Sequence, residues 1–249
     1  IVERHESLRT HFTEIDGEPV QIIAPHLKID LPLEDLSGLN EREQQERVTT
    51  ALWREAGRPF DLACGPILRM RLVKLGERDH VLLRTMHHIV SDGWSGAVFN
   101  REFTILYRAF QEGLENPLSP LSIQYADFAL WQRQQEESLS AGLAYWKRQL
   151  DGIPERLELP ADRPRPPIQT FSAQLCQVKL NSEQTARLNQ LSQEHRATLY
   201  MTMLAAFGLL LSRYTGQEEI VTGSPIANRQ EARLEELIGF FVNTLVLRV

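Results

Sequence analysis

The sequence predicts a protein of the α/β class, α+β in arrangement, with a mixed sheet and flanking helices. The chain has 249 residues, 42% of them apolar, which is enough to bury one large core or two modest ones. Short apolar runs separated by turn residues indicate strands, and apolar residues at helical spacing indicate helices between them. The clearest of these elements are strands at about 66–75 and 79–87 and helices at about 41–57 and 94–113.

The order of elements begins with a hairpin. Strands at 9–15 and 18–23 flank Asp16-Gly17, a dipeptide favoured in tight hairpin turns. A further strand is expected around 27–33. The helix at 41–57 has Leu39-Asn40 as its entry and Gly57 with Pro59 as its stop. The strand pair that follows is joined by Gly76-Glu77-Arg78, and its apolar content indicates a sheet buried on at least one face.

The proline-rich segment ADRPRPP (161–167) is the expected boundary between two lobes, because its prolines enforce an extended path. We therefore divide the chain into a lobe at 1–160, a linker at 161–170 and a second lobe at 171–249. Thr198–Tyr214 is apolar on nearly every side and is expected to be a buried helix. The remaining elements are helices at 122–138, 140–150 and 182–194 and strands at 171–180, 219–224 and 240–249.

Composition excludes several classes of function. The formal net charge is -6 with both signs intermixed, which argues against a nucleic acid or an anionic membrane as partner. No stretch approaches the roughly 18 apolar residues of a membrane span, so we expect a cytoplasmic protein. The chain opens at Ile1 rather than Met and closes in a β-rich run, and we therefore expect an excerpt of a longer protein.

Two adjacent histidines, His87 and His88, lie where the strand at 79–87 ends and the next helix has not begun. An imidazole there can accept a proton from an amine or hydroxyl nucleophile during acyl transfer. Asp92 comes four residues after His88, and Gly93 permits a tight turn. A carboxylate paired with an arginine would lock the backbone that carries the histidine.

Two other interpretations fit the same spacing. Both histidines would be ordinary strand-end residues bonded to backbone, with Asp92 simply the N-cap of a helix starting near Trp94. A metal site is the third interpretation, but the further histidine, cysteine or carboxylate at ligand spacing is missing, so no metal is expected.

The segment MHHIVSDGWS (86–95) resembles the HHxxxDG signature of the condensation domains of nonribosomal peptide synthetases. Other stretches are similar to further motifs of that family in the expected order, including one that matches its common text. They are RHESLRTHF (4–12), YADFALW (125–131), GSPIANR (223–229) and IGFFVNT (238–244). The motifs upstream of the first and downstream of the last have no counterpart, so the resemblance covers the N-terminal lobe and the start of the C-terminal lobe of a chloramphenicol acetyltransferase-like fold.

The resemblance implies roles for the residues of the loop. His88 would be catalytic, as general base or as an orienter of the amine, and His87 would stabilise the loop. Gly93 would supply a backbone N–H near the reacting carbonyl. Asp92 would be structural, with Arg9 as its preferred partner and Arg4 as the fallback. The candidates for lining the tunnel between the lobes are Trp94, Asn243 and Thr244, although hydrogen bonding at a sheet edge is the commoner role for the last two.

The function implied by the resemblance is amide formation between two carrier-bound acyl groups in the biosynthesis of secondary metabolites such as antibiotics. No cofactor is expected in this chain, because the phosphopantetheine arms belong to donor and acceptor peptidyl carrier domains. A neighbouring adenylation domain is also implied. The alternatives are an epimerisation domain, a related HxxxD acyltransferase, or a silent scaffold that only docks a carrier. We expect the excerpt alone to self-associate through its C-terminal part and to lack activity.

Overall fold

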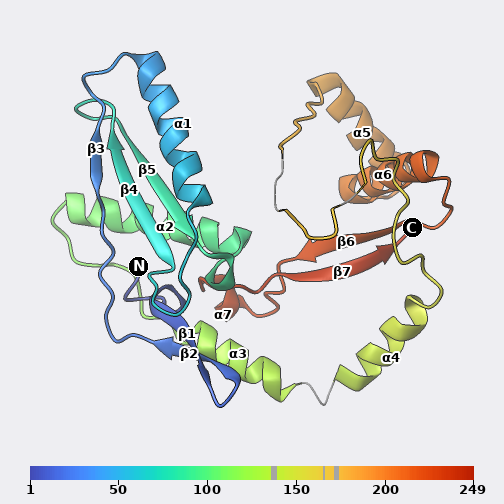
Figure 1. Ribbon diagram of the computed structural model, residues 1–249, viewed down its shortest axis with the longest axis horizontal. Coiled ribbons are helices and arrows are strands. Elements are labelled where there is room, and N and C mark those ends of the chain that lie inside the picture. Colours follow the sequence, from blue (N-terminus) through green and yellow to red (C-terminus); the bar gives the residue numbers. More distant parts are fainter. Residues whose placement is uncertain (136–138, 165, 171–173) are drawn as a thin grey trace. The chain divides into compact units, whose positions relative to one another are not determined.

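The computed structural model describes residues 1–135, 139–164, 166–170 and 174–249 (Figure 1). Its contacts divide the chain into two compact units, which we describe separately. The first unit consists of 1–139 with 226–243, and the second of 140–225 with 244–249. This division falls near residue 140, ahead of the proline-rich segment at 161–167. The lobe boundary at that segment stays a prediction.

The first unit contains a mixed three-stranded sheet, which agrees with the predicted class. Its strands lie in the order β3 (Leu33–Asp35), β4 (Leu68–Lys74) and β5 (His80–Met86). β3 and β4 are parallel, whereas β4 and β5 are antiparallel. The strand expected around 27–33 is wrong except at its last residue. Prolines at both ends of 25–32 remove backbone donors that a longer strand would need.

The predicted hairpin is confirmed as a separate two-stranded sheet of β1 (Thr10–Ile15) and β2 (Glu18–Ile23). Asp16 and Gly17 have φ values of 54° and 82°. Two consecutive positive φ angles are what a type I′ turn requires, and its twist matches that of the flanking strands.

Helix α1 (Glu41–Gly57) packs along the sheet beside β5 (Figure 1). It begins at Asn40, whose side chain accepts a hydrogen bond from the Glu43 amide while the Glu43 carboxylate accepts one from the Asn40 amide. This capping box satisfies two donors that a helix start leaves open. The core between helix and sheet consists of Leu36, Ala51, Val73 and Leu83.

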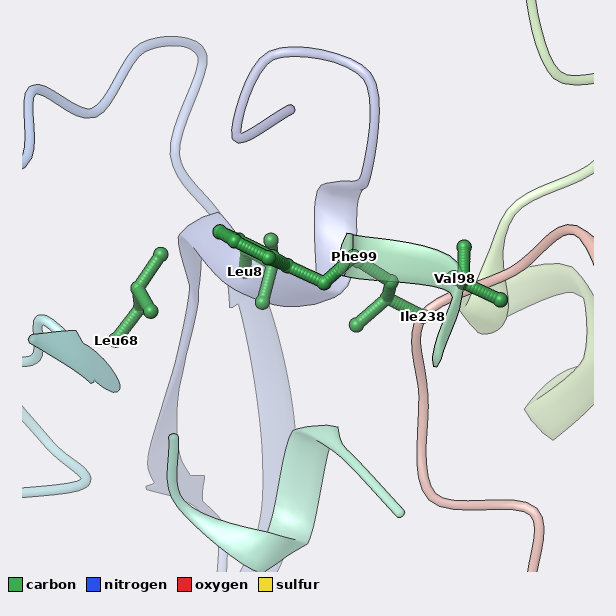
Figure 2. Packing of buried hydrophobic residues seen from close by; sticks show 5 residues of the cluster. All are labelled: Leu8, Leu68, Val98, Phe99 and Ile238. Carbon is green, nitrogen blue, oxygen red and sulfur yellow. The ribbon is translucent and has the colours of Figure 1, made fainter. Parts of the chain in front are cut away.

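A second core of the first unit joins segments that are far apart in the sequence (Figure 2). It brings together 3₁₀ helix η1 (Glu6–Arg9), β4, α2 (Gly93–Gln111) and the segment at residue 238. Its buried members are Leu8, Leu68, Val98, Phe99 and Ile238. Burial of apolar surface is the main stabilising term in such a core, so this packing anchors residue 238 beside the start of α2. The first unit also contains η2 (His88–Val90), α3 (Tyr125–Gln134) and α7 (Ala232–Glu235).

The second unit contains three helices and a strand pair. These are α4 (Ser140–Gln149), α5 (Ser182–Glu194), α6 (Leu199–Thr215), β6 (Val221–Ile226) and β7 (Asn243–Arg248), although Ile226 and Asn243 are grouped with the first unit. Ile220 and Val249 exchange both backbone hydrogen bonds at the end of this pair. The strand expected at 171–180 is wrong for 174–180, where Leu175 and Val178 are exposed, and 171–173 lie outside the described residues.

The expected burial of the helix at Thr198–Tyr214 is also wrong. Among the side chains of α6, only Gly208 and Leu211 are buried. In the described part of the chain α6 packs against α5 and against Val249, which cover one side of it. A helix that is apolar all round needs neighbours on all sides. None of the described helices is both long and apolar enough to span a bilayer.

Candidate active site

The loop between β5 and α2 holds the two histidines in different ways. His87 is tied to the protein: its amide donates to the Ile67 carbonyl at 3.0 Å, and its Nδ1 accepts from the Ile89 amide at 3.0 Å. Its ring also packs edge-on with Phe60. These contacts make His87 the cap of η2 and a support of the loop.

His88 differs from its neighbour because its side chain is exposed, and its imidazole has no hydrogen-bond partner among the residues that the structure describes. Its only ring contact there is with Phe240, at 5.2 Å between ring centroids and 89° between ring planes. The interpretation of both histidines as strand-end residues bonded to backbone therefore fits His87 but not His88. The imidazole of His88 is open to an incoming substrate group.

Asp92 caps α2 and is buried, with 4% of its side chain exposed. Its Oδ1 accepts from the amide and hydroxyl of Ser95 at 2.8 and 2.7 Å, and its Oδ2 accepts from the Phe241 amide at 3.1 Å. Nη2 of Arg229 lies 3.1 Å from Oδ1, and the Arg229 side chain is 1% exposed. Burial alone would raise the pKa of the Asp92 carboxyl, but these donors and the arginine charge outweigh it and lower that pKa.

The buried arginine partner expected for Asp92 is thus present, but it is Arg229. Both arginines proposed for this role are wrong because other groups occupy them. Arg9 binds Glu6 at 3.2 Å and the Ala24 carbonyl, and Arg4 binds Glu102 at 2.8 Å. The GSPIANR stretch ends in Arg229, and its position in a family motif was the available signal. The interpretation of Asp92 as an N-cap is confirmed at the same time.

The segment 237–241 is held against the loop by polar side chains. The Ser95 hydroxyl accepts from the Gly239 amide at 3.0 Å, and the Ser7 hydroxyl donates to the Ile238 carbonyl at 2.6 Å. Nη1 of Arg229 donates to the Leu237 carbonyl at 2.9 Å. With the Phe241 amide on Asp92, these bonds fix the backbone that carries Phe240.

Gly239 is required at its position by a close approach of α3. Tyr125 places its ring against Gly239 and donates its hydroxyl to the Phe240 carbonyl at 2.8 Å. A Cβ at residue 239 would overlap this ring and lie 2.8 Å from the Phe241 ring. The aromatic packing expected for the YADFALW helix therefore has a further consequence, because it positions the segment beside the loop.

We predict that Gly239→Ala destabilises the protein by about 1–3 kcal/mol, the usual cost of overpacking a filled core. The Tyr125 ring must move, which also strains its hydrogen bond to residue 240. Urea denaturation measures the change in the free energy of unfolding. Gly38→Ala is the control, since a Cβ there meets nothing within 4 Å. Equal stability of the two variants would show that the ring adjusts freely.

A buried ionisable pair, which sequence reasoning missed, supports the same segment. His5 Nδ1 accepts from the Ile238 amide at 3.3 Å, so Nε2 carries the proton and donates to Glu102 at 2.8 Å. Burial lowers the pKa of His5 against the effect of Glu102. Burial raises the pKa of Glu102, but His5 and Arg4 outweigh it and lower that pKa. His5 begins the motif HESLRTHF after Arg4, and no periodicity pointed to its burial.

The lowered pKa of His5 predicts a loss of stability on acidification. The unfolded chain, with a reference pKa of 6.5, binds a proton at this residue more readily than the folded state. The free energy of unfolding therefore falls as the pH drops below that value, and the lowered pKa of Asp92 acts in the same direction at more acidic pH. Urea denaturation at about pH 7.5 and about pH 5 should show the difference. His5→Gln should remove most of it, while His80→Gln on the surface should retain it.

Gly93 and Trp94 open α2 and are both exposed. Gly93 is not among the glycines with positive φ, so a special turn conformation is not the reason for it, and a Cβ there would meet nothing within 4 Å. Trp94 Nε1 donates to the Glu235 carbonyl at 2.9 Å, which ties the helix start to α7.

Asn243 and Thr244 are not brought to the loop by the described contacts. Asn243 lines a cavity of about 680 Å³ in the first unit, together with α3 side chains such as Asp127 and Trp131 and residues near α7. Neither His88 nor Asp92 lines this cavity. Thr244 belongs to the second unit, where it lies against Gly223.

A family model described as condensation domain matches residues 1–249. The chain belongs to the condensation domain family. It is 48% identical over 250 residues to a linear gramicidin synthase of Brevibacillus parabrevis and 47% identical over 249 residues to malpibaldin synthetase of Mortierella alpina. These matches cover 100% and 99% of this chain but only 5% and 4% of the relatives.

Solved structures agree with the membership. The X-domain from teicoplanin biosynthesis matches 99% of this condensation domain chain with a TM-score of 0.86 and 29% identity, over 55% of its own length. The first condensation domain of the calcium-dependent antibiotic synthetase matches all of it with a TM-score of 0.83 over 58% of its length, and at 24% identity it supports the fold. The chain thus spans about half the length of these structures, and the predicted family and fold class are confirmed.

Proposed function

We propose that this chain carries the active-site loop of a domain that condenses a donor acyl or peptidyl thioester with an acceptor aminoacyl thioester. The amine nitrogen bonds to the donor carbonyl carbon, the carbon–sulfur bond breaks, and the amine loses a proton while the departing sulfur gains one. The observation that carries the proposal is His88, an exposed imidazole without a hydrogen-bond partner in the described residues, on a loop locked by the buried Asp92–Arg229 pair. Membership of the condensation domain family supports it.

The other loop residues have supporting roles in this proposal. His88 acts on the acceptor amine, as proton acceptor or as the group that orients it. Gly93 lies at the first position of α2, where helix amides lack partners within the helix, and it supplies an N–H for the developing negative charge. His87 and Asp92 hold the loop. Lining of a tunnel by Trp94, Asn243 and Thr244 belongs to the same proposal.

The partners are the donor and acceptor carrier domains, whose phosphopantetheine arms deliver the substrates, and a neighbouring adenylation domain. The relatives that match are synthetases much longer than this chain, which supports such neighbours. The lobes at 1–160 and 171–249, with the linker between them, belong to the proposal. The cytoplasmic location and the self-association of the excerpt stay predictions.

The test uses the complete condensation domain with loaded donor and acceptor carriers. Mass spectrometry of the acceptor carrier should detect the amide product, and calorimetry should measure carrier binding separately. Carrier binding without product would identify a silent docking scaffold. Deuterium uptake from heavy water at the α-carbon of a loaded aminoacyl group, without amide formation, would identify an epimerisation domain.

A further inference from the structure

Phe240 lies between two residues whose backbone is fixed by the active-site loop. On one side the Gly239 amide donates to the Ser95 hydroxyl, and on the other the Phe241 amide donates to the Asp92 carboxylate. The carbonyl of Phe240 itself accepts from Tyr125. The backbone that directs the Phe240 side chain is therefore held by the same groups that cap α2.

The side chain of Phe240 serves no core of the described residues. Its neighbours Ile238 and Phe241 are 1% and 2% exposed and belong to apolar clusters, whereas Phe240 is 40% exposed and belongs to none. Its ring contact is the perpendicular one with His88, at 5.2 Å. Perpendicular rings at this spacing attract each other, because the positive edge of one meets the negative face of the other.

We infer that Phe240 is a positioning residue for His88. The His88 imidazole has no hydrogen bond to hold it among the described residues, and the ring of Phe240 is the group that restricts its rotation. The buried Asp92–Arg229 pair then acts twice, since it locks both the loop that carries His88 and the backbone that carries Phe240. The inference rests on the proposed function of His88 and adds a residue to it.

The test compares Phe240→Leu, which keeps apolar bulk but removes the ring, with Phe240→Tyr, which keeps the ring. In the complete domain, Phe240→Leu should lower kcat by about threefold to tenfold, the loss expected for one ring pair, with KM for both carriers changed by less than about twofold. Phe240→Tyr should restore kcat. The NMR signals of the carbon-bound His88 ring protons, assigned with His88→Gln, should shift in the Leu variant and stay near their parent positions in the Tyr variant.

The two readouts separate this inference from the proposed function. Unchanged kcat and unchanged His88 signals in Phe240→Leu would overturn the positioning role. If the parent domain forms no amide but its His88 signals respond to Phe240→Leu, the proposed function fails while the contact stands. Circular dichroism confirms folding, and should the Leu variant unfold, Phe240→Met removes the ring with a more flexible side chain.

Discussion

His88→Ala in the complete condensation domain is expected to lower the rate of amide formation by about 100-fold or more, the scale of losing a positioned acid–base group. The side chain is exposed and makes no hydrogen bond within the described residues, so its removal leaves the cores of the first unit intact. The melting temperature should therefore match that of the parent. Single-turnover assays with loaded carriers measure the chemical step.

Two further variants sharpen this experiment. His80→Ala removes an exposed histidine at the other end of β5 and should leave the rate unchanged. His88→Gln retains a hydrogen-bond donor and acceptor but cannot take up a proton at neutral pH. A rate near that of the parent for His88→Gln would favour the orienting role, and a rate near that of His88→Ala would favour the proton acceptor. Parent-level activity in His88→Ala would refute the catalytic assignment.

Asp92→Ala is expected to destabilise the first unit by about 3–5 kcal/mol, because it leaves the buried Arg229 guanidinium without its counter-charge. The same change removes the cap of α2 and the acceptor of the Phe241 amide. We expect folding or solubility to suffer at least as much as chemistry. Urea denaturation of the variant measures the loss in the free energy of unfolding.

The matched control is Glu46→Ala, which breaks an exposed pair with Arg42 on α1 and should cost less than about 1 kcal/mol. A double-mutant cycle with Arg229→Ala tests the cause. If the unpaired buried charge dominates, adding Arg229→Ala to Asp92→Ala costs much less than Arg229→Ala costs in the parent. Full additivity would contradict the pairing, and so would an Asp92→Ala variant as stable as the parent.

Local features were predictable from the sequence because each depends on neighbouring residues. The Asp16-Gly17 turn, the Asn40 start of α1 and the change from strand to helical spacing after His88 were all predicted and are present. Backbone preferences and helix caps act over three or four residues, so such signals survive without knowledge of the rest of the chain. The ordered motifs likewise identified the family.

Contacts between distant segments were decided only by the tertiary structure. Arg229, not Arg9, pairs with Asp92 from 137 residues away, and His5 reaches Glu102 and residue 238. No spacing in the sequence encodes such pairings, because they depend on the path by which 226–243 returns to the first unit. The exposure of α6 has the same origin: its apolar sequence was visible, but which of its sides is covered depends on which segments pack against it.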